Sequence, residues 1–247
     1  VHDDYDERSV LWSPSSQIFA TTTFLVAFTI GVAILQTTLH GRSWMFFVLV
    51  SMMSGITSLQ TFHSRVSKRT RNLLLAQIFL LFSLLRLSLF QQFPSSVLGV
   101  DPWSHLSFSL DVARIDKIPI GSRYSGYPAM YLAVVTFAEI VHVDVMTSLV
   151  LTLLFFQLVG FLYTFKLAED LTNTRVALQA TLMLAILQTS VRWGWWLTPT
   201  TVGLSLMPPL VYALLRKNTE HRVKYKFMTI LFLIFVVILH VFTTFVF

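Results

Sequence analysis

Long apolar runs alternate with short polar segments along most of the chain. Seven of these runs predict membrane-spanning helices, because a hydrocarbon core about 30 Å thick needs about 20 predominantly apolar residues in a helix. Their ranges are 17–38, 44–61, 72–92, 145–165, 176–193, 200–215 and 227–247. The pattern therefore predicts an all-α fold, a polytopic transmembrane helix bundle of about seven spans with further helices along its outer face.

Two clusters of basic residues set the expected orientation of these spans. The clusters consist of Arg65, Lys68, Arg69 and Arg71, and of Arg216, Lys217, Arg222, Lys224 and Lys226. Loops rich in Lys and Arg stay in the cytoplasm, so an even number of spans must separate the two clusters. Four spans satisfy this rule. The apolar run 128–143 is then expected to lie on the outer leaflet or dip into it without crossing.

The same pattern divides the chain into three parts. Residues 1–16 form a polar, acidic tail, and residues 17–71 form a transmembrane hairpin with its basic loop. Residues 72–247 form the transmembrane core, which contains a large outer loop at 93–127. Because the chain stops at Phe247 inside an apolar run, we expect further sequence beyond that residue.

Composition supports the membrane interpretation. The chain is 55% hydrophobic and only 12% charged, whereas soluble domains carry about a quarter of charged residues. The net charge of +6 comes from basic residues in short loops, which indicates topology and contact with lipid headgroups instead of nucleic acid. Cysteine is absent, so the chain has no disulfide framework. We expect a multi-pass protein of the cell membrane.

A polar window between apolar runs, residues 99–128, carries the candidate chemistry. Asp101 followed by Pro102 predicts a helix start, with Asp101 as N-cap and Pro102 as the first helical residue. His105, four residues after Asp101, would share its helix face. A carboxylate and an imidazole at a helix N-terminus can bind a metal or handle a phosphate leaving group. A capping Asp needs no such chemistry, so both interpretations stay open.

Other candidate residues fall on the same predicted outer face. Arg192 precedes a Trp-rich segment, and His240 precedes Thr243. Arg can hold a phosphate with two hydrogen bonds, and Trp can stack on a sugar. The alternatives are an interfacial anchor for the Trp cluster and a packed, hydrogen-bonded side chain for His240. Arg86 lies inside a predicted span, where we expect its side chain to snorkel outward in preference to binding phosphate.

Residues 99–105 (GVDPWSH) resemble the first acidic motif of GT-C membrane glycosyltransferases. The motif is most similar to the Asp-Pro-(Trp/Tyr)-x-(Asn/His) form in archaeal oligosaccharyltransferase catalytic subunits. The order of spans and loops over 72–215 is similar too, and residues 240–243 (HVFT) resemble a His-x-x-Thr pattern of archaeal relatives. The resemblance implies a GT-C-like bundle. Such a bundle transfers a sugar or glycan from a polyprenyl phosphate or diphosphate to a protein, lipid or glycan acceptor on the non-cytoplasmic face.

The resemblance also implies roles for individual residues. Asp101 would be a general base or a ligand of a divalent metal, Mg²⁺ or Mn²⁺, and His105 would orient Asp101 or the donor phosphate. The implied substrate-binding residues are Arg192, Arg123, Tyr127, Trp103 and His240. The second acidic motif of the oligosaccharyltransferase branch has no match, because residues 193–201 contain no carboxylate. Both roles of Asp101 therefore stay open.

Two other functions remain open at this point. A non-catalytic subunit that binds polyprenyl lipid is favoured by the missing acidic motif. A lipid flippase or transporter would need ionisable residues at mid-membrane or broken helices. Arg86 is the candidate for such a residue.

Overall fold

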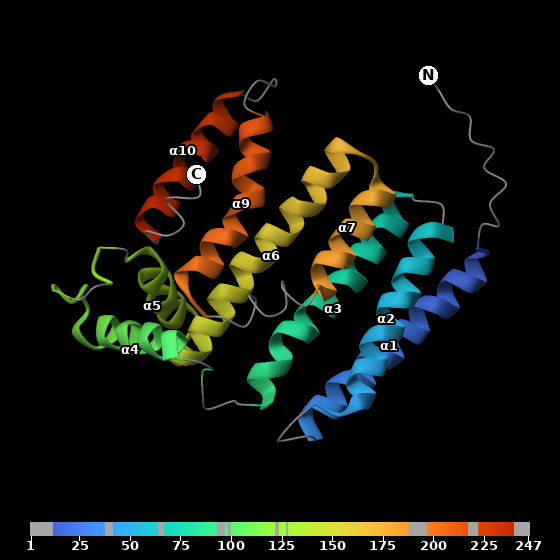
Figure 1. Cartoon of the computed structure of the whole chain (residues 1–247), viewed down its shortest axis with the longest axis horizontal. Coiled ribbons are helices and arrows are strands. Elements are labelled where there is room, and N and C mark those ends of the chain that lie inside the picture. Colours follow the sequence, from blue (N-terminus) through green and yellow to red (C-terminus); the bar gives the residue numbers. More distant parts are fainter. Residues whose placement is uncertain are drawn as a thin grey trace. The chain divides into compact units, whose positions relative to one another are not determined.

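The computed structural model describes residues 12–37, 42–63, 67–92, 97, 100–121, 124–126, 128–187, 197–216 and 222–239. Throughout these ranges the regular secondary structure is helical (Figure 1). The helices are α1 (Pro14–Thr37), α2 (Trp44–His63), α3 (Lys68–Gln92), α4 (Val100–Ile115), α5 (Ala129–Val141), α6 (Val145–Leu171), α7 (Thr174–Ile186), α9 (Pro199–Arg216) and α10 (Arg222–Leu239). The prediction of an all-helical chain is confirmed over the described ranges.

Four of the described helices are long and apolar enough to cross a membrane. They are α1, α2, the Lys68–Ser88 part of α3, and α6. α5 and α7 are shorter apolar helices of 13 residues each, or about 20 Å. Because the two helices have the same length, that length does not distinguish the expected outer-leaflet helix at 128–143 from the expected span at 176–193, and both stay predictions. The coarse prediction of a helical membrane protein is thus supported, and the finer one of seven GT-C-like spans stays a prediction.

The chain forms two compact units. The first comprises residues 1–94 and 168–188, and the second comprises residues 95–167 and 189–247. α1, α2, α3 and α7 therefore belong to the first unit, whereas α4, α5, α9, α10 and most of α6 belong to the second.

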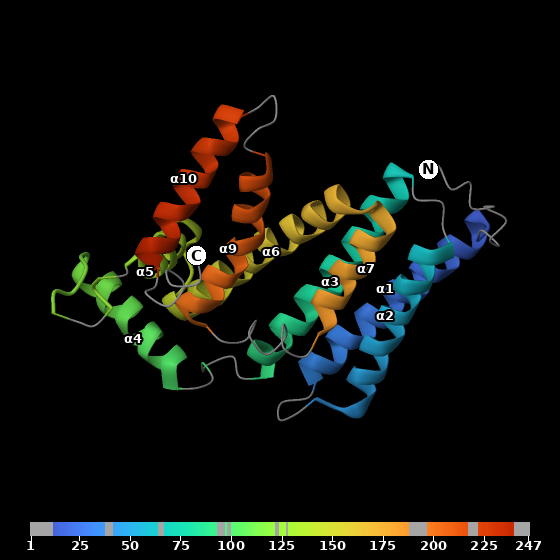
Figure 2. The same cartoon turned by 45° about the horizontal axis from the view of Figure 1, so that its top comes forward.

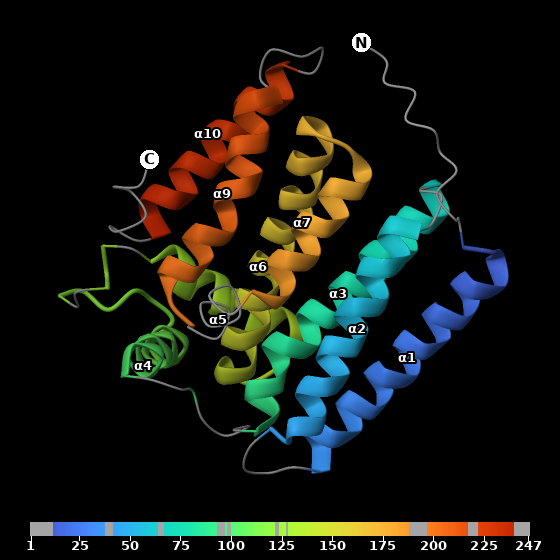
Figure 3. The ribbon, with the colours of Figure 1, turned by 45° about the vertical axis from the view of Figure 1, so that its right-hand side comes forward.

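Within the first unit, α1, α2 and α3 lie side by side, and α7 packs against α2 and α3 (Figures 2 and 3). The core combines apolar side chains with a buried polar group. The Gln60 and Gln77 amides both donate to the Thr21 hydroxyl, at 3.1 and 3.4 Å. Such interhelical hydrogen bonds are typical of helices that associate in lipid, where apolar packing alone gives little specificity.

Within the second unit, α4 packs on α5, and α10 packs on both α9 and α5. The Ser148 hydroxyl near the start of α6 donates to the Val134 carbonyl of α5 at 2.5 Å. α9 contains two consecutive prolines, Pro208 and Pro209, in its interior. Because proline has no N–H, these residues free backbone carbonyls one turn earlier in the helix.

Candidate functional site

The first turn of α4 carries Asp101. The helix begins at Val100, so Asp101 is its second residue instead of the predicted N-cap. The carboxylate still lies at the positive end of the helix dipole, which favours a negative charge. Asp101 is exposed, and within the described part of the chain it takes part in no hydrogen bond or ion pair. Its oxygens are therefore not used to cap the backbone.

His105 points into the contact between α4 and α5. Its side chain is only 5% exposed, and its Nδ1 lies 2.7 Å from the Tyr131 hydroxyl. Within the described residues, Tyr131 is a hydrogen-bond partner of the imidazole. That His105 orients Asp101 or the donor phosphate stays a prediction. One turn of α4 separates an exposed carboxylate from a buried imidazole.

Aromatic rings surround the His105 imidazole. The ring of Tyr124 lies 4.9 Å from it between centroids, and Phe108 packs edge-on against Tyr131 at 4.6 Å. Aromatic pairs at these distances stabilise a contact beyond the area that they bury. The cluster holds α4 on α5, and the Ser148–Val134 bond holds α5 on α6. Asp101 is thus presented from a helix that is fixed to the second unit.

Of the predicted substrate-binding residues, the structure describes Trp103. Trp103 lies two residues after Asp101 and is 49% exposed. The remaining four, Arg123, Tyr127, Arg192 and His240, lie outside the residues that the structure describes. Whether they approach Asp101 therefore stays a prediction.

The predicted divalent metal at Asp101 stays a prediction. Mg²⁺ and Mn²⁺ prefer several oxygen ligands, including carboxylates. Within the described ranges, no three His, Cys, Asp or Glu residues come together in a way that could hold an ion. Asp101 is the carboxylate that the first turn of α4 brings to the site.

An apolar groove lies on another side of α5. It has a volume of about 440 Å³ and runs between α5 and α10 in the second unit. Its lining residues are Ala129, Leu132, Ala133, Thr136, Phe137, Ile140, Phe235 and Ile238. Its lining is apolar apart from the Thr136 hydroxyl.

Arg86 does not snorkel, contrary to the prediction. Its side chain is 2% exposed, and its Nη1 donates to the Ala185 carbonyl of α7 at 2.6 Å. Its guanidinium carbon lies 3.8 Å from the centroid of the Phe82 ring. Ala185 belongs to the last turn of α7, where backbone carbonyls lack helical partners. Arg86 therefore stabilises the end of a short helix within the first unit.

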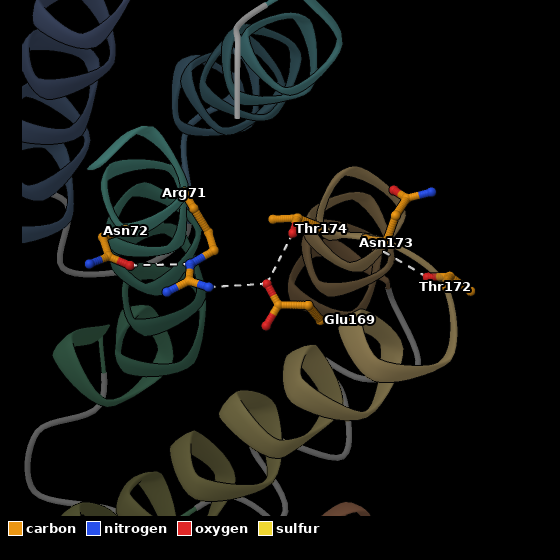
Figure 4. Close-up of polar contacts among 6 residues, drawn as sticks. All are labelled: Arg71, Asn72, Glu169, Thr172, Asn173 and Thr174. Atoms are coloured by element: carbon orange, nitrogen blue, oxygen red, sulfur yellow. Dashed lines mark hydrogen bonds and ion pairs between the residues drawn. The ribbon is translucent and has the colours of Figure 1, made fainter. Parts of the chain in front are cut away.

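An ion pair joins the start of α3 to the end of α6 at one end of the first unit. Nη1 of Arg71, near the start of α3, lies 3.3 Å from Oε1 of Glu169, near the end of α6 (Figure 4). The Thr174 hydroxyl donates to the same oxygen at 3.1 Å, and Asn173 caps α7 by accepting from the Val176 N–H. The start of α3 and the turn before α7 thus share one end of the unit. Their predicted common location in the cytoplasm requires this arrangement, and the identity of that face stays a prediction.

The sequence analysis did not predict two of these side-chain contacts. The contact between His105 and Tyr131 spans 26 positions, and the one between Arg71 and Glu169 spans 98. Neither pair has a spacing that a single helix would bring together. The one available signal was the period of the α4 sequence, because His105 falls on its apolar face with Leu106, Phe108 and Val112.

Comparison of this chain with protein-family models, with curated proteins and with solved structures finds no match.

Proposed function

We propose that this protein is a membrane glycosyltransferase of the GT-C type. It transfers a sugar or glycan from a polyprenyl phosphate or diphosphate to an acceptor at the non-cytoplasmic face. The observation that carries the proposal is the exposed Asp101 carboxylate, which has no described hydrogen-bonding partner and stands on a helix anchored through His105. The motif at 99–105, with its resemblance to the GT-C enzymes, supplies the class of reaction.

In this proposal Asp101 acts as the general base. Its carboxylate takes the proton of the acceptor as the acceptor atom attacks the anomeric carbon of the sugar. The bond from that carbon to the phosphate oxygen breaks, and the polyprenyl phosphate or diphosphate leaves with the electron pair. A positioned base of this kind contributes about 10²–10⁴-fold to a rate. His105 is a positioning residue, since it contacts Tyr131 and fixes α4.

Three features of the described residues support a lipid-linked sugar as the donor. Four helices are apolar enough to place the protein in a membrane, where such donors reside. The groove between α5 and α10 can take part of an aliphatic chain, and α5 also carries Tyr131, the partner of His105. The exposed Trp103 ring lies two residues from Asp101 and can stack on a sugar face.

The test is the Asp101→Asn variant of the protein, assayed for transfer from a radiolabelled polyprenyl-phosphate sugar in membranes. We expect transfer to fall at least 100-fold while donor binding persists, because Asn keeps the shape of Asp but cannot accept the proton. Asp111→Asn is the matched control, since Asp111 is also an exposed carboxylate of α4. Transfer at the parent rate by Asp101→Asn would remove the proposal.

One observation favours a second candidate, a subunit that binds polyprenyl lipid without turnover. The described residues place no second carboxylate with Asp101 in a metal-binding group. The same assay separates the two candidates. Retention of the labelled lipid by the parent protein, with no transfer to any acceptor class, would select the binding subunit.

A further inference from the structure

Charge is distributed unevenly along the second unit. The acidic residues that the structure describes there are Asp101, Asp111, Asp116, Glu139 and Asp144. All of them lie on α4, on α5 or in the segments beside these helices, and Asp144 directly precedes α6. Lys166 lies 22 residues further along α6 (166 − 144), or about 33 Å. That length is close to the thickness of a bilayer core.

Three tyrosines meet at the Lys166 end of the unit. The rings of Tyr163 in α6 and Tyr212 in α9 lie 5.3 Å apart, and Tyr212 lies 6.2 Å from Tyr225 in α10. These contacts join α6 to the end of α9, and the end of α9 to the start of α10. Tyrosine is enriched at the level of lipid headgroups, because its ring is apolar and its hydroxyl is polar.

Each of these tyrosines has a basic residue within about one turn. Lys166 follows Tyr163 by three residues, and Arg216 follows Tyr212 by four, which places each pair on one helix face. The guanidinium carbon of Arg216 lies 5.7 Å from the Tyr212 ring centroid. On α10, Lys224 and Lys226 flank Tyr225, and both lysines are exposed. We call this group of three tyrosines and four basic residues the tyrosine–basic end.

The surface of α10 beside these lysines is apolar and exposed. Val223, Phe227, Ile230 and Ile234 recur at helical spacing and are 76%, 64%, 57% and 55% exposed. A ligand that covers both regions needs a negative group beside the lysines and an aliphatic part along the stripe. A free phosphate lacks the aliphatic part. A phospholipid has both parts in one molecule.

We propose that the tyrosine–basic end binds the headgroups of anionic phospholipids, with their acyl chains along the exposed stripe of α10. The lysine and arginine side chains pair with the phosphates, and the tyrosine hydroxyls donate to phosphate oxygens. This inference is independent of Asp101 and of the proposed glycosyl transfer. It holds equally for an enzyme and for a binding subunit.

The test compares lipid binding by the full chain and by two charge-matched double variants in a non-ionic detergent. Lys224→Gln/Lys226→Gln removes two charges from the tyrosine–basic end. Arg114→Gln/Lys117→Gln removes two exposed charges from the α4 end of the same unit. Phosphatidylglycerol and phosphatidylcholine are titrated separately at low salt, and native mass spectrometry counts the bound lipids.

We expect the first variant to lose affinity for phosphatidylglycerol by about fivefold per removed charge, since each basic residue near a lipid surface contributes about that factor. The second variant should bind phosphatidylglycerol like the parent, and all three proteins should bind phosphatidylcholine more weakly and alike. Lys224→Arg/Lys226→Arg keeps the charge and should keep the affinity.

Four results would overturn the proposal. The first is parental binding of phosphatidylglycerol by Lys224→Gln/Lys226→Gln, and the second is an equal loss in the Arg114→Gln/Lys117→Gln control. The third is a loss of affinity in Lys224→Arg/Lys226→Arg, because it would show that charge is not what the lipid contacts. The fourth is displacement of phosphatidylglycerol by glycerol phosphate at equal concentration, which would identify a site for free phosphate.

Discussion

Gly160 of α6 lies directly against the backbone carbonyl of Ser205 in α9. A Cβ atom built on Gly160 would stand 2.2 Å from the Ser205 oxygen, far inside van der Waals contact. Pro209, four residues after Ser205, has no N–H to donate to that oxygen. The glycine thus permits a close crossing at the point where the prolines interrupt the hydrogen bonding of α9.

We predict that Gly160→Ala destabilises the second unit by about 1–3 kcal/mol, because the new methyl group forces two helix backbones apart. The measurement is the free energy of unfolding in mixed micelles. Gly55→Ala in α2 is the control, since a Cβ on Gly55 meets nothing within 4 Å. That control should stabilise the chain by about 0.5–1 kcal/mol through the lower chain entropy and better helix propensity of alanine. Equal effects of the two substitutions would contradict the close crossing.

The buried position of Arg86 leads to a second prediction. Arg86→Leu removes a charge-assisted hydrogen bond to Ala185 and the contact with the Phe82 ring. We expect a loss of about 1.5–3 kcal/mol in the free energy of unfolding. Arg86→Lys should lose less, because an ammonium group can still donate to the carbonyl. An arginine that snorkels to the surface would give no loss with either variant, so unchanged stability would restore the snorkelling interpretation.

Helix positions could be predicted largely from the sequence, whereas the side-chain partners could not. Hydropathy and its period are local properties, so they identify α1, α2, α3 and α6 over most of their lengths. The expected span at 176–193 is described only as far as residue 187, and within that part α7 ends at Ile186, where Arg86 of α3 donates to the Ala185 carbonyl of its last turn. That contact joins residues 99 positions apart, and no local pattern encodes it.

The candidate site shows the same division between local and distant effects. The Asp-Pro pair correctly indicated a helix at the start of the polar window, with its first residue two positions earlier than predicted. The helical spacing of Asp101 and His105 indicated a shared face. Burial separates them, because His105 lies at the α4–α5 contact and finds the Tyr131 hydroxyl there. Helical spacing alone cannot distinguish the buried edge of a face from its exposed edge.

The contact between His105 and Tyr131 leads to a third prediction. Tyr131→Phe keeps the ring in its aromatic cluster but removes the hydroxyl 2.7 Å from the imidazole. Leaving a buried polar atom without this partner should cost about 1–3 kcal/mol. Tyr163→Phe is the control, because no hydrogen bond of its hydroxyl occurs among the described residues. A loss below that of the control would show that the imidazole does not depend on Tyr131.

Asp144 gives a prediction for pH. Hydrogen bonds from the Thr147 hydroxyl at 2.5 Å and the Thr147 N–H at 2.9 Å lower the pKa of its carboxyl below the usual value. A lowered folded-state pKa means that the charged form is stabilised on folding. The contribution is therefore complete above the unfolded pKa of about 3.9 and is lost as the pH falls through the lower folded value. Stability should decline in that acidic range.

Substitutions of Asp144 measure how much its carboxylate stabilises the start of α6, where it accepts from the Thr147 N–H. Asp144→Ala should cost about 1 kcal/mol at pH 7, the typical value of an N-cap. Asp144→Asn should retain most of that energy, because Asn also caps helices, but should lose the acid dependence at this position. The free energy of unfolding, measured from about pH 3 to about pH 7, gives both the cost at neutral pH and the acid dependence, because this range includes the unfolded-state pKa of about 3.9. The same acid dependence in parent and Asp144→Asn would assign it to other carboxylates.

Membrane topology can be tested with single cysteines, because the parent chain has none. Lys117→Cys lies beyond the end of α4, Lys68→Cys begins α3, and Lys224→Cys lies near the start of α10. The predicted orientation places the first outside and the other two inside. A membrane-impermeant maleimide should therefore label Lys117→Cys in intact cells and the other two only after permeabilisation. Labelling of Lys68→Cys and Lys224→Cys from opposite sides would require an odd number of crossings between them, and α5 would then have to be reconsidered as a span.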